Sequence, residues 1–249
     1  MRLRPFVAAL FFLAGPASAT AAELVVSAAA SLTDAFQAVG KAYEARHPDT
    51  RVVLNFAASD VLLRQISNGA PADVFASADE AAMDKAVAAG AVDPATRRDF
   101  AGNRLVLVVP KDGRVHVTSV AGLRDRTVKR VAFGDPASVP AGRYTRSALE
   151  HQGLWDTVSA KAVLAQNVRQ GLDYVARGEV DAGFVFATDA SIVRDKVDVA
   201  AIVPTPVPIT YPIAVVAGSK QAAEAGRFEA FVQSAEGRAI LAGFGFQAP

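Results

Sequence analysis

Short apolar runs alternate with segments of helical period along the chain from about residue 24 onward. The apolar runs predict strands, and the three-to-four-residue period predicts helices with one apolar face. Regular alternation of the two is typical of an α/β fold with mostly parallel sheets flanked by helices. The predicted strands cover 24–27, 51–56, 73–76, 104–110, 130–133, 161–164, 182–186 and 211–216, and the predicted helices cover 32–46, 60–68, 78–89, 142–152, 168–177, 221–234 and 238–242.

One part of this pattern occurs twice, which predicts two similar lobes. Each copy runs from a helix through Gly and a short turn to Asp and an apolar strand, as QISNGAPADVFASAD and as YVARGEVDAGFVFATD. No linker rich in Pro, Gly or Ser separates the halves, so we expect strands to cross directly near Asn103 and near 203–210. The first lobe is assigned residues 23–103 and 209–249, and the second lobe residues 104–208.

The N-terminus has the order of a secretory signal peptide. Two arginines precede an apolar run from Phe6 to Ala14, and small residues follow. The run is too short to span a bilayer. Residues 1–22 are therefore assigned to a signal peptide, with cleavage after Ala19 or after Ala22. Its loss removes two arginines and changes the formal charge from +1 to −1.

The composition argues against several classes of protein. Lys and Arg number 26 against 25 Asp and Glu, so neither a nucleic-acid-binding surface nor an acidic tail is expected. Cysteine is absent, so an exported form would rely on its core without disulfides and would offer no thiol for a lipid anchor. A freely periplasmic protein is the expected result.

Four predicted strand-to-helix turns carry small residues or bare backbone. The stretch LVVSAAASLTDAF places only Ser and Ala, at 27–31, between a strand and a helix. Ser31 and Ser59 head two predicted helices, and Ala141 and Val168 lie at the start of two more. In parallel sheets such turns lie at the carboxyl ends of the strands, where ligands bind. Helix N-termini there hold anions without a cationic side chain, because their first N–H groups are unpaired.

The spacing leaves a second interpretation of the two serines open. Ser is favoured as a helix N-cap, and Asp34 follows Ser31 by three residues as in a capping box. On this interpretation Ser31 and Ser59 are ordinary caps without a ligand. Asp60, directly after Ser59, is expected to point to solvent and to favour the helix dipole.

Enzymatic activity is not predicted. A serine nucleophile needs a base, and the three histidines, His47, His116 and His151, lie in polar, surface-like contexts outside any G-x-S-x-G motif. Neither a phosphate-binding loop nor a dinucleotide glycine motif occurs, and the scattered histidines form no zinc-ligand cluster in the sequence.

Six motifs, in order along the chain, carry a resemblance to a known family. They are AAASLTDAF, FAAS followed by LLRQI and NGAPADVFASAD, GDPASVPAGRY, GLWDTVSAK, NVRQGLDYVARGE and ITYPIAVV. From Leu24 to the terminal GFGF the chain resembles the periplasmic molybdate-binding proteins of ABC transporters. The resemblance implies a two-lobed type II periplasmic binding protein fold, without cofactor, that captures molybdate and tungstate. It also implies a monomer that serves a membrane permease and its ATPase.

The resemblance further implies which residues bind the oxyanion. Two serines of the family's first lobe, each acting through hydroxyl and amide, correspond to Ser31 and Ser59. Two backbone amides of the second lobe correspond to Ala141 and Val168. A family tyrosine corresponds to Phe186, which has no hydroxyl. No residue is expected to ligate the metal atom itself.

The missing hydroxyl at Phe186 leaves the ligand preference open. Thr188 or a trapped water would replace it, or the phenyl ring leaves a gap. Tyr211, where the chain recrosses between the lobes, is interpreted as hinge packing. A site made only of donors suits a fully deprotonated dianion and disfavours protonated phosphate. Molybdate and tungstate are not separated on this basis, and a receptor for sulfate or thiosulfate is the alternative.

Overall fold

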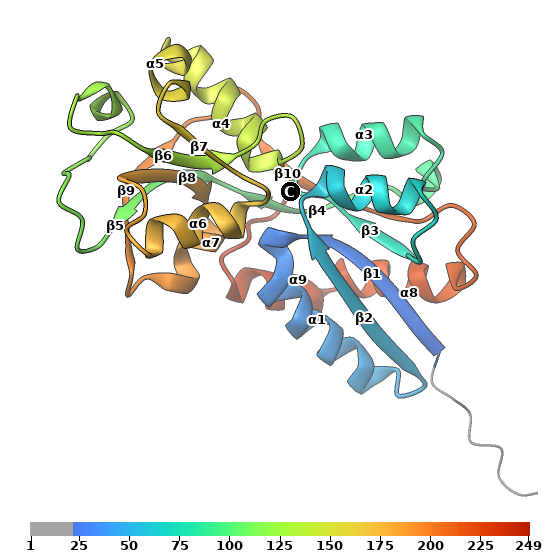
Figure 1. The fold of residues 1–249 in the computed structure, drawn as a ribbon. Coiled ribbons are helices and arrows are strands. Elements are labelled where there is room, and N and C mark those ends of the chain that lie inside the picture. The colour runs from blue at the N-terminus through green and yellow to red at the C-terminus, as the bar shows by residue number, and fades with distance from the viewer. Residues whose placement is uncertain (1–21) are drawn as a thin grey trace, which may run out of the picture.

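The chain folds into two lobes, each a five-stranded sheet with helices on both faces (Figure 1). The computed structural model describes residues 22–249, and the predicted signal peptide lies outside them except for Ala22. In each sheet one strand runs against the other four, so the prediction of a mostly parallel α/β fold is confirmed. Within residues 22–249, no helix has the length and apolarity needed to cross a membrane.

The first lobe contains both ends of the described chain. Its elements are β1 (Ala22–Ala29), η1 (Ala30–Leu32), α1 (Thr33–Arg46), β2 (Thr50–Ala57), α2 (Ser59–Ser67), β3 (Val74–Ala76), α3 (Glu80–Ala88), η2 (Pro94–Thr96), β4 (Arg98–Asn103), β10 (Ile209–Val215), α8 (Ala222–Val232) and α9 (Ala235–Gly243). The strand order is β2-β1-β3-β10-β4. β1 pairs in parallel with β2 and β3, whereas β10 is antiparallel to both of its neighbours.

The second lobe is formed by the middle of the chain. Its elements are β5 (Leu105–Pro110), η3 (Ala121–Arg124), β6 (Val131–Gly134), α4 (Pro140–His151), α5 (Trp155–Ser159), β7 (Ala162–Ala165), α6 (Val168–Ala176), β8 (Ala182–Phe186), α7 (Ala187–Ala190), η4 (Ser191–Val193) and β9 (Val197–Val203). The strand order is β7-β6-β8-β5-β9. β6 pairs in parallel with β7 and β8, and β5 is the antiparallel strand.

The two sheets have equivalent topologies. The triplet β2-β1-β3 of the first sheet corresponds to β7-β6-β8 of the second, and a reversed strand follows in each. The repeated sequence pattern falls on equivalent elements, namely α2 with β3 and α6 with β8. The prediction of two similar lobes therefore agrees with the structure.

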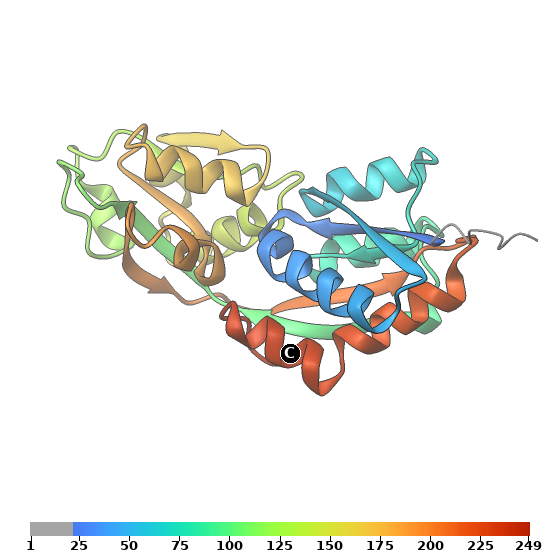
Figure 2. The ribbon, with the colours of Figure 1, turned by 90° about the horizontal axis from the view of Figure 1, so that it is seen from below.

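Two strand-to-strand connections join the lobes. Arg104 alone separates the end of β4 from the start of β5, so the chain enters the second sheet without a linker. The return path runs from Val203, which pairs with Leu105, to Ile209, which pairs with Asn103. The two connections consequently lie side by side, as the crossing between the lobes in Figure 2 shows.

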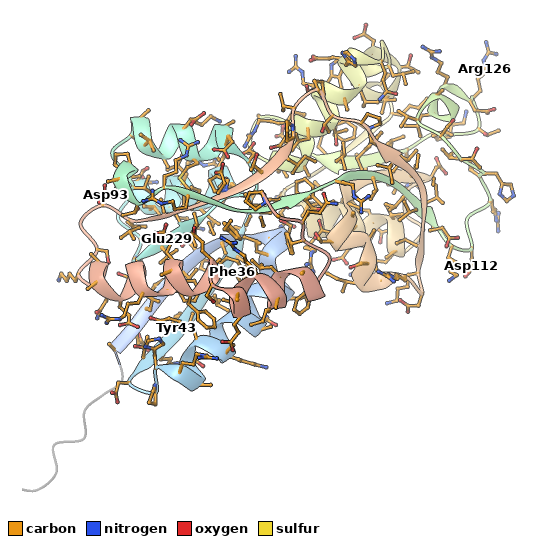
Figure 3. All side chains as sticks on the ribbon, turned by 180° about the vertical axis from the view of Figure 1, so that it is seen from behind. Phe36, Tyr43, Asp93, Asp112, Arg126 and Glu229 are labelled. Atoms are coloured by element: carbon orange, nitrogen blue, oxygen red, sulfur yellow. The ribbon has the colours of Figure 1, made fainter. Side chains whose placement is uncertain are left out.

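Aromatic packing fixes the C-terminal helices to the first lobe. Phe36 and Tyr43, both fully buried on α1, pack on Phe228 of α8 with ring centroids 6.2 and 5.2 Å away. Tyr43 also contacts Phe231, at 5.5 Å between ring centroids. Figure 3 shows Phe36 and Tyr43 close to these helices. Burying one such ring contributes roughly 1.5–3 kcal/mol, so the chain end is a firm part of this lobe.

The strands β4 and β9, the short helices α5 and α7 and the 3-10 helices η1 to η4 are absent from the sequence-based prediction. The other strands and helices are confirmed to within about three residues at each end. The sequence of β4, RDFAGN, contains Asp, Gly and Asn, which disfavour strands, and it becomes a strand by pairing with β10. β9 is an edge strand with Val199 and Ile202 exposed. Its apolar residues therefore do not alternate with polar ones in the usual way.

Candidate anion-binding site between the lobes

A small cavity of about 10 Å³ lies between the two lobes. It brings together all five residues assigned from the sequence, Ser31, Ser59, Ala141, Val168 and Phe186. The other described residues that line it are Ala29, Ala30, Ala58, Ala78, Val139, Pro140 and Asn167. None of these side chains carries a charge. Polar contacts to a ligand must therefore come from hydroxyls, one amide and the backbone.

Sheet topology explains why distant turns meet at this cavity. β1 and β2 are parallel neighbours, and Ala29 pairs with Ala57 at their carboxyl ends. The chain leaves β1 into η1 and leaves β2 through Ala58 into α2, so Ser31 and Ser59 reach the same edge of the sheet. The alanine side chains at these turns are small, so they extend little from the backbone into the cavity. A small ligand can thus approach the backbone, which accounts for the small residues Ala29, Ala30 and Ser31 that line the cavity.

Ser31 does not cap a helix. It lies inside η1, and the residue before α1 is Leu32, without a side-chain cap. The Ser31 Oγ atom instead lies 3.0 Å from the hydroxyl oxygen of Tyr211 on β10, at hydrogen-bond distance. The alternative of an ordinary N-cap is therefore wrong for Ser31.

Ser59 does not cap a helix either. It is the first residue of α2, whose N-cap is Ala58, and no side chain caps this end. The Ser59 Oγ atom accepts a hydrogen bond from the Ala78 N–H at 3.1 Å. Because this bond uses only a lone pair, the hydroxyl proton of Ser59 stays available for an anion.

Two glycines allow α4 to begin directly against the end of β6. A Cβ atom on Gly142 would lie 1.9 Å from the Gly134 carbonyl oxygen, and one on Gly134 would lie 2.3 Å from Val139 Cγ1. Pro140 occupies the first turn of this helix, where its missing N–H has no consequence. The motif GDPASVPAG thereby places the Ala141 backbone at the cavity.

Asn167 is the N-cap residue of α6, and it was not assigned to the site from the sequence. Its Oδ1 atom accepts a hydrogen bond from the Gln170 N–H at 3.0 Å, and the residue lines the cavity. The signal that could have found it is Asn directly before the predicted helix, since Asn is a favoured N-cap. Val168 follows as the first helical residue, with its N–H at the positive end of the helix dipole.

Three helices present their N-terminal N–H groups to the cavity. The first N–H groups of a helix have no partner within it. In α2 the first N–H that donates to a backbone carbonyl is that of Val61, which bonds the Ala58 carbonyl. In α4 the first such N–H is that of Arg143, which bonds the Val139 carbonyl. The N–H groups of the preceding residues, Ser59 and Ala141 among them, are left for a ligand.

Asp60 is buried and paired with cations, so the expectation that it points to solvent is wrong. Its Oδ2 atom accepts a hydrogen bond from the Arg143 guanidinium at 2.6 Å, and its Oδ1 lies 2.5 Å from Lys85 Nζ. Arg143 also donates from Nε to Asp79 Oδ2 at 2.7 Å. These cations offset the negative charge that Asp60 would otherwise place beside an anion site.

A second arginine bridges the lobes on the other side. Arg169 of α6 donates from Nε to Asp189 Oδ1 at 2.6 Å, and its NH1 atom lies 2.8 Å from Asp34 Oδ2 on α1. Asp189 is completely buried, and this burial raises its pKa to about 6 although the guanidinium of Arg169 lowers it. The helix that offers Val168 to the cavity is thus tied to the first lobe.

Phe186 ends β8 and closes one wall of the cavity. Its ring lies 5.7 Å from the Tyr211 ring and 6.2 Å from the Tyr144 ring, centroid to centroid. Thr188 does not line the cavity, and its Oγ1 atom accepts a hydrogen bond from Asn103 Nδ2 at 2.9 Å. The suggestion that Thr188 replaces the missing hydroxyl is therefore wrong. Tyr211 packs at the crossing, as expected, and in addition bonds Ser31.

Two lobes joined by crossing strands, with a cavity between them at the carboxyl ends of their parallel strands, define a type II periplasmic binding protein fold. The sequence pattern of the family described as bacterial extracellular solute-binding protein matches residues 24–247. The chain belongs to this family of solute-binding proteins. The prediction of a transport protein rather than an enzyme is thereby confirmed.

Individual relatives are similar over most of their length. The chain is 38% identical to the molybdate-binding protein ModA of Escherichia coli (strain K12), covering 95% of this chain and 93% of that one. It is 41% identical to YvgL of Bacillus subtilis (strain 168), which is named as an ABC transporter substrate-binding lipoprotein. The match covers 90% of this chain and 86% of YvgL. Among solved structures, the periplasmic molybdate-binding protein of Azotobacter vinelandii superposes with a TM-score of 0.77 at 26% identity, covering 91% and 99%.

Proposed function

We propose that the protein binds molybdate between its lobes and delivers it to an ABC importer. The observation that carries this proposal is a small cavity whose lining, among residues 22–249, includes hydrogen-bond donors and small side chains and no charged group. The relatives named as molybdate-binding proteins support the choice of ligand. Ser31, Ser59, Ala141 and Val168 are the proposed binding residues, and Phe186 forms a wall without a hydroxyl.

The donor set favours an anion that only accepts hydrogen bonds. Ser31 and Ser59 offer hydroxyl protons, and Ala141 and Val168 offer N–H groups at helix starts. Molybdate is a tetrahedral dianion with four accepting oxygens, so each donor finds a partner. Phosphate near neutral pH keeps a proton, which would need an acceptor such as a carboxylate. None of the described residues that line this cavity has a carboxylate.

Ligand binding is expected to favour the closed arrangement of the lobes. Two of the proposed residues belong to the first lobe and two to the second, so all contacts form together only when the lobes are closed. The closed form then docks as a monomer on a membrane permease whose ATPase drives uptake. Tungstate has the same charge and nearly the same size, and is expected to bind as well.

The proposed role requires export to the periplasm. Cleavage after Ala19 or after Ala22 would give the mature receptor. Intact-mass measurement of periplasmic material is expected to show the loss of the first 19 or 22 residues. Full-length protein in the inner membrane would contradict export.

The test of the function is a calorimetric titration of the mature protein with molybdate, tungstate, sulfate and phosphate. Molybdate and tungstate are expected to bind with similar affinity. Sulfate is smaller than molybdate. When it makes close contacts to one lobe, its contacts to the other lobe become longer, and binding is weaker. Phosphate is expected to bind least. Tighter binding of sulfate or thiosulfate than of molybdate would overturn the proposal in favour of the alternative receptor.

A further inference from the structure

Asn103, at the crossing between the lobes, has an amide whose orientation is fixed by its neighbours. The Arg104 backbone N–H donates to Asn103 Oδ1 at 2.8 Å, and a backbone N–H can only donate. The Asn103 Nδ2 atom must therefore face the other way. From there it donates one N–H to Thr188 Oγ1 at 2.9 Å and the other to the Tyr211 hydroxyl oxygen at 3.2 Å.

Tyr211 is completely buried, so its hydroxyl has no access to bulk water. The hydroxyl oxygen already accepts from Asn103, and its single proton needs an acceptor. Within the described part of the chain, the Ser31 Oγ atom at 3.0 Å is the acceptor within reach. Burial also raises the pKa of Tyr211 well above its usual value, which keeps this proton in place.

A hydrogen bond from Tyr211 to Ser31 has a direct consequence for the cavity. It occupies a lone pair of the Ser31 oxygen, and the Ser31 proton must then point elsewhere. Ser31 is buried and lines the cavity, so an anion there is the partner that its proton reaches. The donors run in one direction, from Asn103 through Tyr211 and Ser31 to the ligand.

We propose that Tyr211 and Asn103 are positioning residues that direct the Ser31 hydroxyl proton into the cavity and thereby disfavour protonated oxyanions. This inference rests on the proposed function, because it concerns the same cavity. The Ser59 hydroxyl is also held as a donor, but by a different hydrogen bond. Its oxygen accepts from the Ala78 backbone N–H, which no side-chain substitution removes. Both serine hydroxyls are thus held as donors towards the ligand.

Tyr211→Phe removes the donor to Ser31 and keeps the ring. The freed Ser31 hydroxyl can then rotate and accept a hydrogen bond from a protonated ligand. Molybdate binding is expected to weaken roughly 2- to 10-fold, the effect of one lost orienting hydrogen bond. Binding of hydrogen phosphate is expected to weaken less or to improve, so the ratio of the two affinities falls. A general structural defect would weaken both ligands alike.

Double variants separate positioning from general damage. In the Ser31→Ala background, Tyr211→Phe is expected to change molybdate affinity less than about 2-fold, because the group it orients is gone. In the Ser59→Ala background it is expected to have its full effect. Tyr43→Phe removes the hydroxyl of another buried tyrosine, which bonds Glu224 far from the cavity, and serves as the control with unchanged affinity.

A second variant tests the direction of the hydrogen bonds. Asn103→Asp has nearly the same shape but an accepting oxygen towards Tyr211, so Tyr211 would donate to it and Ser31 would donate to Tyr211. The Ser31 proton is then withdrawn from the cavity. Molybdate binding is expected to fall further than in Tyr211→Phe, and thermal unfolding with and without molybdate identifies any variant that fails to fold.

The outcomes of the two proposals are distinguishable. Wild-type protein that does not bind molybdate would refute the proposed function, whatever the variants do. Wild-type binding of molybdate with equal effects of Tyr211→Phe in the Ser31→Ala and Ser59→Ala backgrounds would refute the positioning role alone. An unchanged ratio of molybdate to phosphate affinity in Tyr211→Phe would do the same.

Discussion

Arg143 of the second lobe donates a hydrogen bond from Nε to Oδ2 of Asp79 in the first lobe, at 2.7 Å. The same guanidinium bonds Asp60, and both acids are nearly buried. Asp60 and Asp79 directly follow Ser59 and Ala78, the pair whose hydrogen bond holds the Ser59 hydroxyl. One side chain of the second lobe therefore neutralises two carboxylates of the first lobe beside the cavity.

Removing this guanidinium is expected to open the lobes. Arg143→Met keeps much of the side-chain volume but leaves Asp79 unpaired and Asp60 with Lys85 alone. An uncompensated buried charge costs about 3–5 kcal/mol, and opening lets water relieve it. We expect at least a tenfold loss of molybdate affinity and, by small-angle scattering, a larger radius of gyration than wild type at the same ligand concentration.

The matched control for Arg143→Met lies one turn further along α4. Arg146 pairs with Glu150 on the same helix, and both side chains are about half exposed. Such a pair is worth at most about 1 kcal/mol and does not cross between the lobes. Arg146→Met should leave affinity and radius unchanged, and an effect equal to that of Arg143→Met would contradict the bridging role.

The two serine hydroxyls are expected to dominate recognition by side chains. Each hydrogen bond to a charged oxyanion is worth roughly 1.5–3 kcal/mol, or about one to two decades in affinity. Ser31→Ala and Ser59→Ala should each weaken molybdate binding by that amount in calorimetry. His151→Ala, an exposed change at the end of α4, should have no effect. Unchanged affinity in both serine variants would show that their hydroxyls do not touch the ligand.

Phe186→Tyr is expected to tighten molybdate binding. The Phe186 ring lines the cavity, and Thr188, engaged with Asn103, does not take over the donor role. A new hydroxyl directed at the anion would add one charge-assisted hydrogen bond, worth at most roughly 1.5–3 kcal/mol. Titration of the variant and the wild type under the same conditions measures the difference. Weaker binding would mean that the hydroxyl crowds the cavity rather than filling a gap.

Asp189 is expected to make stability depend on pH. Burial raises its pKa to about 6, so the native state holds this proton more tightly than the unfolded chain, whose carboxyl titrates near 4. Its contribution to stability is full below about pH 4 and is lost as the pH rises through 6. Between pH 5 and pH 7 the loss amounts to ~1 kcal/mol.

Comparison with Asp189→Asn isolates this contribution. Glu229, whose pKa burial raises to about 7, acts in the same direction in both proteins. Denaturant unfolding at pH 5 and pH 7 should therefore give a smaller difference between the two conditions for Asp189→Asn than for wild type. An equal difference would show that Asp189 keeps its usual pKa in the folded protein.

Local sequence patterns determined most of the secondary structure and the positions of the candidate site residues. Apolar runs and helical periods located most strands and helices, because each depends on residues a few positions apart. The same is true of the site, since Ser31, Ser59, Ala141 and Val168 each lie at, or directly before, the start of a predicted helix that follows a predicted strand. Parallel strands bring such turns to one edge of a sheet, so these four positions could be selected from the sequence and the family resemblance.

Tertiary structure alone decided what these residues contact. Ser31 and Tyr211 are 180 positions apart and become neighbours because β10 returns to the first sheet after the second lobe is complete. Asp60 and Arg143, 83 positions apart, meet across the boundary between the two lobes. β4 is a strand because β10 pairs with it. Hydrogen bonds and ion pairs of this kind depend on the order of strands in space, which no local pattern of apolar and polar residues encodes.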